Sequence, residues 1–330
     1  MIKKILLIFL LTYPQFSYSN VEIDFNIWLN KFKIRALKKG ISEETINNSF
    51  KNAKYLKQVI KYDRYQPEFF EDTKTYINKR ATPSRMLKAK ALLIKNQKLF
   101  DEVEKKFNVE KELLLALWGI ETNFGKHVGK MDIISSLATL SFDKRRSEFF
   151  SKELIILLKL IDQKLVDVDN LYGSWAGAFG NFQFMPSAIE NYAIDYDKNG
   201  KIELKQSLHD AVASAANYLN KIGWKYQSSC FYKVKLTKPI PKKYINTSAK
   251  KIKNYMIIKS WKKKGIVDIE HISVKNKAAL VIPDLAVSEG NENSPAFLVF
   301  KNYEKILKWN RSLRFGVTIC TLANMIKNEI

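Results

Sequence analysis

Glu121 lies near the end of a segment, 108–125, and directly follows a stretch of apolar residues and one glycine at 113–120. Asn108 is a favourable N-cap and Gly125 a favourable terminator, so the segment predicts a buried helix. Glu121 follows Leu117 by four residues and shares its face. Desolvation there disfavours the ionised carboxylate, and a carboxyl group that stays protonated near neutral pH can protonate a glycosidic oxygen. The structural alternative is a glutamate that reaches solvent or caps a neighbouring turn.

A glycine-rich segment, 172–187, follows later in the chain. Three of the twelve glycines fall within eight residues, at Gly173, Gly177 and Gly180. Glycine lets the backbone approach a ligand closely, and the aromatic residues between them offer flat faces for sugar rings. Ser174 and Gln183 add hydrogen-bonding groups. The segment therefore predicts a loop that lines a binding groove, with a tight crossing inside the core as the structural alternative.

The stretch 195–206, DYDKNGKIELKQ, resembles an EF-hand calcium loop, in which alternate oxygen ligands surround the ion and a glycine makes the tight turn. The candidate ligands are Asp195, Asp197, Asn199, the backbone carbonyl of Lys201, and Asp210. Gln206 takes the twelfth position, where a bidentate glutamate is usual. Asp210 could close the site or could be the N-cap of the next helix, so a structural calcium and a metal-free acidic turn both stay open.

The elements that must position these residues are mostly helical. Apolar residues recur at three- and four-residue spacing from Val21 to about Phe107, with a helix start at Ser42. Helical signal continues in 112–120, 154–161 and 210–222, and returns from Tyr303 to Ile330. Between about 226 and 300 the period shifts to two, with short strands expected at 231–236, 279–283 and 296–300. The fold class predicted is mainly α (α+β).

The chain of 330 residues is 46% hydrophobic, which excludes wholesale disorder. Lys and Arg number 56 against 33 Asp and Glu, a net charge of +23, and 48 of the 56 are Lys. Sequence-specific phosphate readers favour Arg for bidentate contacts, so this excess argues against nucleic-acid recognition. It indicates either a compositional bias or attraction to an acidic polymer.

Residues 1–19 predict a secretory signal peptide: Lys3 and Lys4 precede an apolar run from Ile5 to Leu11, and small residues follow. An N-terminal membrane anchor that stays attached is the alternative. No Cys lies near the predicted cut, so a lipid anchor is not expected, and we predict a periplasmic, soluble mature chain.

Cys230 and Cys320 would then meet an oxidising compartment, either paired or as two buried small apolar residues. The three His residues are scattered, and no His-x-x-x-His or Cys-x-x-Cys supports a zinc site.

WGIETNFG around Glu121 and the later SWAGAFGNFQFMPS together resemble the lytic murein transglycosylase B family, secreted enzymes that cleave peptidoglycan. DRYQPEFF at 63–70, LATLSFDKRRSEFF at 137–150 and LVFKNYEKILKWNRS at 298–312 extend the resemblance over most of the chain. It implies a lysozyme-like core at 96–225 and a small β subdomain at 226–300. A helical region built from both ends of the chain, 20–95 and 301–330, would flank them.

The resemblance also implies that Glu121 is the sole acid and base. It would protonate the oxygen between N-acetylmuramic acid and N-acetylglucosamine, then deprotonate the muramic 6-hydroxyl, which attacks its own C1 to form a 1,6-anhydro sugar. Hydrolases ordinarily use two carboxylates, whereas an internal nucleophile needs one group that gives and then takes a proton. The family's substrate-contacting positions correspond to Ser174, Gln183, Met185, Trp309 and Asn310. Trp309 stands where a tyrosine is commoner in the family.

Two other functions stay open: a hydrolytic muramidase on the same scaffold, and a non-catalytic peptidoglycan-binding scaffold. The expected partner is the glycan strand of peptidoglycan, with the positive charge attracted to its acidic peptide stems; cell-wall synthesis or turnover proteins are further candidates. Neither nucleic acid nor stable membrane insertion is expected. No cofactor is expected for catalysis, and calcium, if bound, would be structural.

Overall fold

The computed structural model describes residues 21–66, 70–169, 171–286 and 294–329. The predicted signal peptide, 1–19, lies outside the described residues. The helices in the described parts are α1 (Val21–Leu37), α2 (Glu43–Phe50), α3 (Lys57–Arg64), α4 (Thr73–Arg80), α5 (Pro83–Lys95), α6 (Gln97–Phe107), α7 (Lys111–Thr122), α8 (Ile133–Phe142), α9 (Ser147–Asp162), α10 (Pro186–Tyr192), α11 (Leu208–Lys221), α12 (Ile258–Lys263), α13 (Lys301–Trp309) and α14 (Leu313–Glu329). The prediction of a mainly α fold is confirmed.

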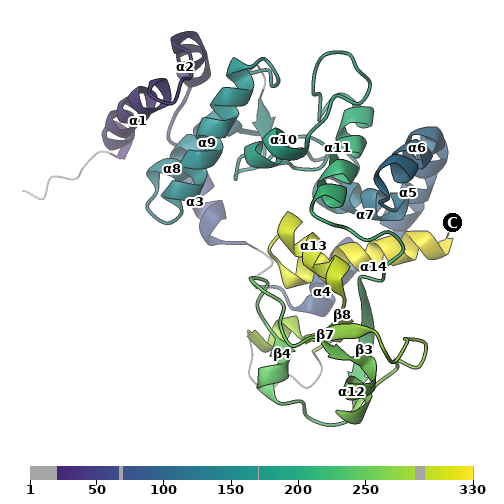
Figure 1. The fold of residues 1–330 in the computed structure, drawn as a ribbon. Helices are drawn as coiled ribbons and strands as arrows, with labels where there is room; N and C mark the ends of the chain where they lie inside the picture. Colours follow the sequence, from purple (N-terminus) through teal and green to yellow (C-terminus); the bar gives the residue numbers. More distant parts are fainter. Residues whose placement is uncertain (1–20, 67–69, 170, 287–293, 330) are drawn as a thin grey trace, which may run out of the picture.

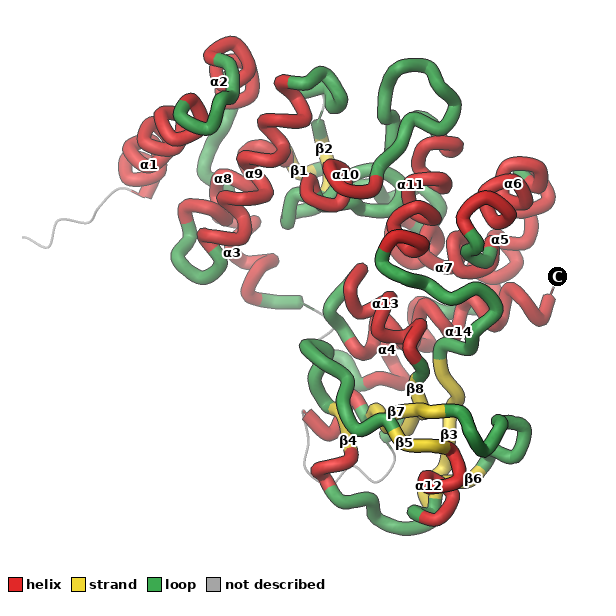
Figure 2. Tube along the Cα trace, in the orientation of Figure 1, coloured by secondary structure: helices red, strands yellow, loops and turns green. Residues whose placement is uncertain are grey.

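Most of the strands belong to one small sheet, apart from the helices (Figure 2). The strands are β1 (Met131–Asp132), β2 (Tyr172–Gly173), β3 (Phe231–Leu236), β4 (Ile245–Asn246), β5 (Met256–Ile257), β6 (Ile266–Val267), β7 (Lys277–Val281) and β8 (Ala296–Val299). The sheet has the order β4-β7-β8-β3-β6, with β5 also paired to β7. The β4–β7 pair is parallel and the others are antiparallel. β1 and β2 form a separate ribbon with Met131 opposite Gly173.

Both faces of the sheet are buried, and alternate residues of its strands serve different cores. In β8, Phe297 and Val299 join the large core formed by the helices, whereas Ala296 and Leu298 face a smaller core that includes Trp261 of α12. This follows from the two-residue period of a strand, whose successive side chains point to opposite faces. The sheet therefore attaches to the helical part through one face and is closed by α12 on the other.

The C-terminal helices pack on the second half of the N-terminal region, whereas α1 packs mainly on α2 and α8. α14 packs against α4, α5 and α7, and Figure 1 shows α13 and α14 between the other helices and the sheet. A buried ion pair joins Arg314 of α14 to Asp284, with 2.9 Å between Nη2 and Oδ1. Asp284 also accepts a hydrogen bond of 3.0 Å from the backbone N–H of Thr73 in α4. The C-terminal helix is thus fixed against both the N-terminal helices and the sheet.

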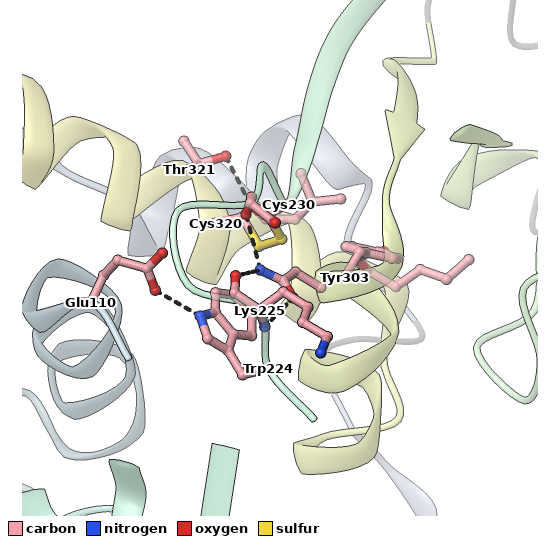
Figure 3. The surroundings of a disulfide bond; sticks show 11 residues. Glu110, Trp224, Lys225, Cys230, Tyr303, Cys320 and Thr321 are labelled. Atoms are coloured by element: carbon pink, nitrogen blue, oxygen red, sulfur yellow. Dashed lines mark hydrogen bonds between the residues drawn. A yellow bond between two sulfur atoms is a disulfide. The ribbon is translucent and has the colours of Figure 1, made fainter. Parts of the chain in front are cut away.

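Cys230 and Cys320 form a disulfide, which decides between the two alternatives that the sequence leaves open. Figure 3 shows the bond between the segment that enters β3 and helix α14, with Trp224 and Glu110 nearby. The indole N–H of Trp224 donates to the Glu110 carboxylate at 2.6 Å. The disulfide closes a loop of 90 residues and so limits the freedom of the unfolded chain.

None of the helices in the described residues is long and apolar enough to cross a bilayer.

Candidate active site

Glu121 occupies the last turn of α7, a helix whose other side chains are largely buried. Residues from Leu113 to Gly119 are all buried, and Glu121 itself is half-buried. The predicted start of this helix is wrong: Asn108 is the C-cap of α6 with φ 52°, and α7 begins at Lys111 after Glu110. Asn is favourable both at N-caps and in the left-handed conformation, so local sequence did not distinguish the two.

The end of α7 is tied to the glycine-rich loop by Asn181. The hydroxyl of Thr122 donates to the Asn181 carbonyl at 2.8 Å, and the Trp118 indole N–H donates to the Asn181 side-chain oxygen at 2.9 Å. The Asn181 amide in turn donates to the carbonyl of Leu204 at 3.1 Å. Asn181 is a positioning residue that the sequence analysis missed. The sequence feature that could have identified it is a polar side chain inside the largely apolar FGNFQF stretch. A polar side chain in a buried loop needs hydrogen-bond partners.

The glycines of the loop are required by backbone conformation and close packing. Gly177 has φ +88°, and a Cβ there would lie 2.4 Å from Leu137 Cδ2. Gly180 has φ +79°, and a Cβ there would lie 2.7 Å from the Cβ of Leu204. Positive φ favours glycine because it has no Cβ. The loop is thus pressed against α8 on one side and against the segment before α11 on the other.

Ser174 and Gln183 are partly exposed, and their side-chain hydrogen bonds also fix the shape of this loop. The Ser174 hydroxyl accepts a hydrogen bond from the backbone N–H of Ala178 at 3.0 Å. The Gln183 amide donates to the carbonyls of Val128 at 3.1 Å and Gly180 at 3.0 Å. Gln183 itself has φ 50°. Met185 is the N-cap of α10, which begins at Pro186.

Trp309, at the end of α13, makes the contact that brings the C-terminal part of the chain to Glu121. Its indole N–H donates a hydrogen bond of 3.0 Å to Oε1 of Glu121. The Trp309 ring stacks on Tyr218 with 4.8 Å between centroids, and Tyr218 stacks on Tyr192 at 4.3 Å. Burial, together with the neighbouring Tyr192, raises the pKa of Tyr218 to about 12. The three rings form a rigid wall that holds the indole at the carboxylate.

A cavity of about 580 Å³ lies along this wall. Gln183, Met185 and Trp309 line it, together with the cationic side chains of Arg146 and Arg311. Asn310 follows Trp309 as the C-cap of α13, and Ser174 lies further along the loop; in the described part of the chain neither is among the lining residues. The structure therefore brings three of the predicted residues, Gln183, Met185 and Trp309, to one cavity. Glu121 does not line this cavity but joins the group through its hydrogen bond from Trp309.

Among the described residues that line the cavity, Glu153 is the one with an acidic side chain. It is 3% exposed, and its two carboxylate oxygens accept hydrogen bonds from the backbone N–H and the hydroxyl of Ser187, at 2.9 and 2.7 Å. Glu153 thus binds the first turn of α10. The geometry gives Glu153 a structural role at the start of α10.

The acidic loop brings three of its predicted ligands together. Asp195, Asp197 and Asp210 each offer an oxygen within 4.8 Å of the others. These are hard oxygen donors, as a calcium ion prefers. Asp195 and Asp197 also accept hydrogen bonds from the N–H of Asn199, at 3.1 and 3.3 Å, which holds the turn closed. The side-chain oxygen of Asn199 accepts from the N–H of Lys201 at 2.9 Å.

Asp210 is not the N-cap of α11, as one of the two sequence-based interpretations has it. The cap is Ser207, whose hydroxyl accepts from the N–H of Asp210 at 3.2 Å. Asp210 is fully buried, and its carboxylate accepts hydrogen bonds from the backbone N–H groups of Tyr196, at 2.8 Å, and Glu203, at 2.9 Å. The residue closes the acidic loop from inside.

Comparison with known proteins shows the family that this chain resembles. The family model of the "Transglycosylase SLT domain" matches residues 24–324. The membrane-bound lytic murein transglycosylase B of Escherichia coli (strain K12) is 43% identical over 119 residues. That stretch spans 36% of this chain and 33% of the relative, so the match covers about a third of the relative's length.

Solved structures extend the likeness to the whole fold. SltB3 from Pseudomonas aeruginosa, in complex with NAG-NAM-pentapeptide, is 30% identical with a TM-score of 0.81, covering 92% of this chain and 79% of that one. The Escherichia coli lytic transglycosylase Slt35, in complex with calcium, matches at TM-score 0.76 and 24% identity over 95% of both chains, which supports the fold alone. Since the family model spans nearly all of the described residues, this chain belongs to the transglycosylase SLT domain family.

Proposed function

We propose that this protein cleaves the β-1,4 bond between N-acetylmuramic acid and N-acetylglucosamine in peptidoglycan and leaves 1,6-anhydromuramic ends. The observation that carries the proposal is Glu121, a half-buried carboxyl group that accepts a hydrogen bond from the indole of Trp309, a residue that lines the cavity. Membership of the transglycosylase SLT domain family supports the reaction class. A relative of the same fold, SltB3, has been solved with NAG-NAM-pentapeptide bound, which supports the substrate class.

In the proposed mechanism Glu121 acts twice. The protonated carboxyl group first gives its proton to the glycosidic oxygen while the bond between that oxygen and muramic C1 breaks. The resulting carboxylate then takes the proton of the muramic 6-hydroxyl as O6 bonds to C1. The leaving sugar keeps the first proton, Glu121 regains one, and no water is consumed. General acid–base transfer of this kind contributes about a hundred- to ten-thousandfold to a rate.

The surroundings of the cavity favour a mechanism with one carboxylate. A hydrolase ordinarily needs a second carboxylate, to activate water or to act as the nucleophile. Glu153 is the acid that lines the cavity among the described residues, and both its oxygens are engaged by Ser187. An intramolecular 6-hydroxyl replaces the second group. In this proposal Gln183, Met185 and Trp309 contact the sugars beside the cleaved bond. Ser174 and Asn310, described residues that do not line the cavity, contact sugars further along the glycan strand.

A hydrolytic muramidase is the second candidate, because the same acid could serve a reaction in which water enters. Purified sacculi digested with this protein would distinguish the two, since anhydromuramic ends resist borohydride reduction whereas hydrolysed ends are reduced. Mass spectrometry of the released muropeptides should show anhydro ends. Recovery of reducible ends alone would establish the hydrolase, and absence of any release would leave a binding scaffold as the function.

The acidic loop is proposed to hold a structural calcium ion. Asp195, Asp197 and Asp210 supply clustered carboxylates, and Asn199 and the Lys201 carbonyl would complete the oxygen set. Gln206 cannot act as a bidentate carboxylate, so we expect weak affinity. Calcium should raise the thermal unfolding midpoint of the protein and a chelator should reverse the change. An unfolding midpoint that ignores both additions would remove the metal from this proposal.

We further propose that the chain works in the periplasm, because residues 1–19 predict an export signal and the Cys230–Cys320 disulfide suits an oxidising compartment. The division into a catalytic core at 96–225, a β subdomain at 226–300 and flanking helices at 20–95 and 301–330 is part of the same proposal. The separate small core around Trp261 supports a distinct β subdomain. Detection of the processed chain in a periplasmic extract would test the location.

A further inference from the structure

Helix α1 is apolar on two opposite faces. Phe25, Leu29, Phe32 and Ala36 are buried and pack on the helical core. Ile27 lies two residues from both Phe25 and Leu29, which on an α-helix is about 200° around the axis. Ile27 therefore points away from the core. A surface helix normally carries polar residues on that side.

Four large apolar residues lie along the outward face, and we call them the α1 outer stripe: Ile23, Ile27, Ile34 and Leu37. Their exposed fractions are 57%, 51%, 55% and 45% in that order. Their spacing of four, seven and three residues keeps them in one line along a helix. The exposed Asn30 lies on the same face between Ile27 and Ile34 and divides the stripe into two apolar pairs. Exposed apolar groups that occur singly need no explanation, but four of them aligned on one helix mark a surface that binds something.

The stripe has positive charge on both sides. Lys31 and Lys38 flank one edge and Lys33 the other, while Arg35 and Lys39 add to the same helix and the turn after it. Two acids, Glu22 and Asp24, lie in the first turn of the helix. Long Lys and Arg side chains can extend their charges beyond a buried apolar face. A row of apolar residues bordered by cations is typical of a helix that lies in the interface of an anionic bilayer.

The location of α1 suits a flat partner. Figure 1 shows α1 at the outer edge of the molecule, on the far side of α8 and α9 from the sheet. The helix has 17 residues and is about 25 Å long, so its outer stripe could lie flat on a surface. In sequence it begins directly after the predicted export segment, 1–19. A second copy of the chain fits less well, because self-association would bring Lys31, Lys33 and Lys38 against the same cations of the partner.

We propose that the α1 outer stripe binds reversibly to the surface of an anionic phospholipid bilayer. The helix would lie parallel to the membrane, with Ile23, Ile27, Ile34 and Leu37 among the acyl-chain ends and the lysines at the headgroups. This is adsorption of a folded helix, with no segment crossing the bilayer. The surface lies on α1, away from Glu121 and the cavity, so the inference does not depend on the proposed reaction.

The test is co-sedimentation of the processed full-length protein with lipid vesicles. Vesicles of phosphatidylglycerol mixed with phosphatidylethanolamine should bind the protein, and vesicles of phosphatidylcholine should bind it at least about tenfold less. Ile27→Glu combined with Ile34→Glu should lower binding about tenfold or more, because it places charges in the apolar face. Lys31→Gln with Lys38→Gln should weaken binding to the anionic vesicles and reduce its salt dependence.

The matched control is Leu87→Glu with Ile94→Glu on α5, where the original side chains are 55% and 67% exposed. It should leave vesicle binding unchanged, as should Glu121→Gln. All these surface variants should keep the wild-type unfolding midpoint, and the α1 and α5 variants should act normally on sacculi, which contain no lipid. Equal binding to neutral and anionic vesicles, or undiminished binding by the α1 double variant, would overturn the proposal. A concentration-dependent dimer in the absence of lipid, lost in that variant, would assign the stripe to a second copy instead.

Discussion

Glu121 and Asp210 are carboxylates with contrasting surroundings, although their regions are neighbours. Glu121 is half-buried at the end of α7 and accepts a hydrogen bond from an indole on a distant helix. Asp210 is fully buried, and backbone N–H groups of its own loop donate to both of its oxygens. A carboxylate bound by backbone donors fixes the shape of a loop. A half-buried carboxyl group beside a residue that lines a cavity is placed to exchange a proton with a ligand. The difference separates the structural acid from the candidate catalytic one.

Asn181 connects the two regions. Its side-chain oxygen accepts from Trp118 in α7, and its amide donates to the carbonyls of Leu204 and Lys205 in the acidic loop. The acidic loop therefore supports the glycine-rich loop, which in turn supports the end of α7. We expect changes in the acidic loop to act on stability, and changes around Glu121 to act on the rate of cleavage.

The largest effect should come from Glu121→Gln. The amide keeps the size of the side chain but can neither give nor take the proton, so release of muropeptides from sacculi should fall about a thousandfold. The unfolding midpoint should stay near that of the wild type. Glu112→Gln, in the first turn of the same helix, is the matched control and should keep its activity. If Glu121→Gln released muropeptides at the wild-type rate, the catalytic assignment would be wrong.

The next effect is on stability and concerns Asp210→Asn. An Asn can still accept from Tyr196, but its NH2 group would face the N–H of Glu203, leaving two buried donors without an acceptor. We expect a loss of about 3 kcal/mol in the free energy of unfolding, measured by urea denaturation. The control is Asp268→Asn, since Asp268 is half-exposed and pairs with an exposed lysine. A variant of normal stability that had lost activity would instead place Asp210 with the catalytic group.

Asp63 is another buried structural carboxylate, and its contribution to stability should depend on pH. Burial alone would raise its pKa, but hydrogen bonds and charges from Arg145 and Arg146 hold the pKa of Asp63 below its usual value. A lowered pKa contributes stability above about pH 4, and that contribution is lost as the pH falls through the folded-state pKa. Asp63→Asn should therefore cost about 2 kcal/mol near pH 7, and less at acid pH.

The expected loss of stability in Asp63→Asn is modest, because both arginine side chains are partly exposed, 46% and 39%, and water can solvate them after the change. Urea denaturation at several pH values would measure the difference from the wild type. The control is Glu148→Gln, which removes a largely exposed pair with Lys152 and should have little effect. A difference that stays constant below pH 4 would show that the ion pair is not its source.

Local pattern predicted much of this fold and less of the site. The apolar spacing located most of the helical regions but missed α8 and α12. The Ser42 cap is confirmed by its hydrogen bond from the N–H of Thr45, 3.2 Å long. The Asn108 cap was wrong because Asn suits both ends of a helix. The contact between Trp309 and Glu121 joins residues 188 positions apart, and no local rule reaches that far. For Trp309 and the other substrate positions, the resemblance to a family supplied what spacing could not.

The smallest effect should come from Trp309→Phe, which tests whether the indole acts through its N–H or through its ring. Phenylalanine keeps an aromatic face for stacking on Tyr218 but loses the hydrogen bond to Glu121. Loss of this hydrogen bond to the Glu121 carboxyl group should lower kcat about tenfold, with little change in KM. Trp309→Tyr, which keeps a hydroxyl donor, should retain more activity than Trp309→Phe.

Two other results would each revise the role of Trp309. A rise in KM with kcat unchanged would mean that the ring serves as a platform for sugar and that its N–H does not assist Glu121. Loss of stability in Trp309→Phe would mean that the stack from Tyr192 through Tyr218 depends on the indole. The comparison with Asp210 requires the first pattern, a change in kcat at normal stability, because a side-chain donor at a cavity edge should influence the reaction more than the fold.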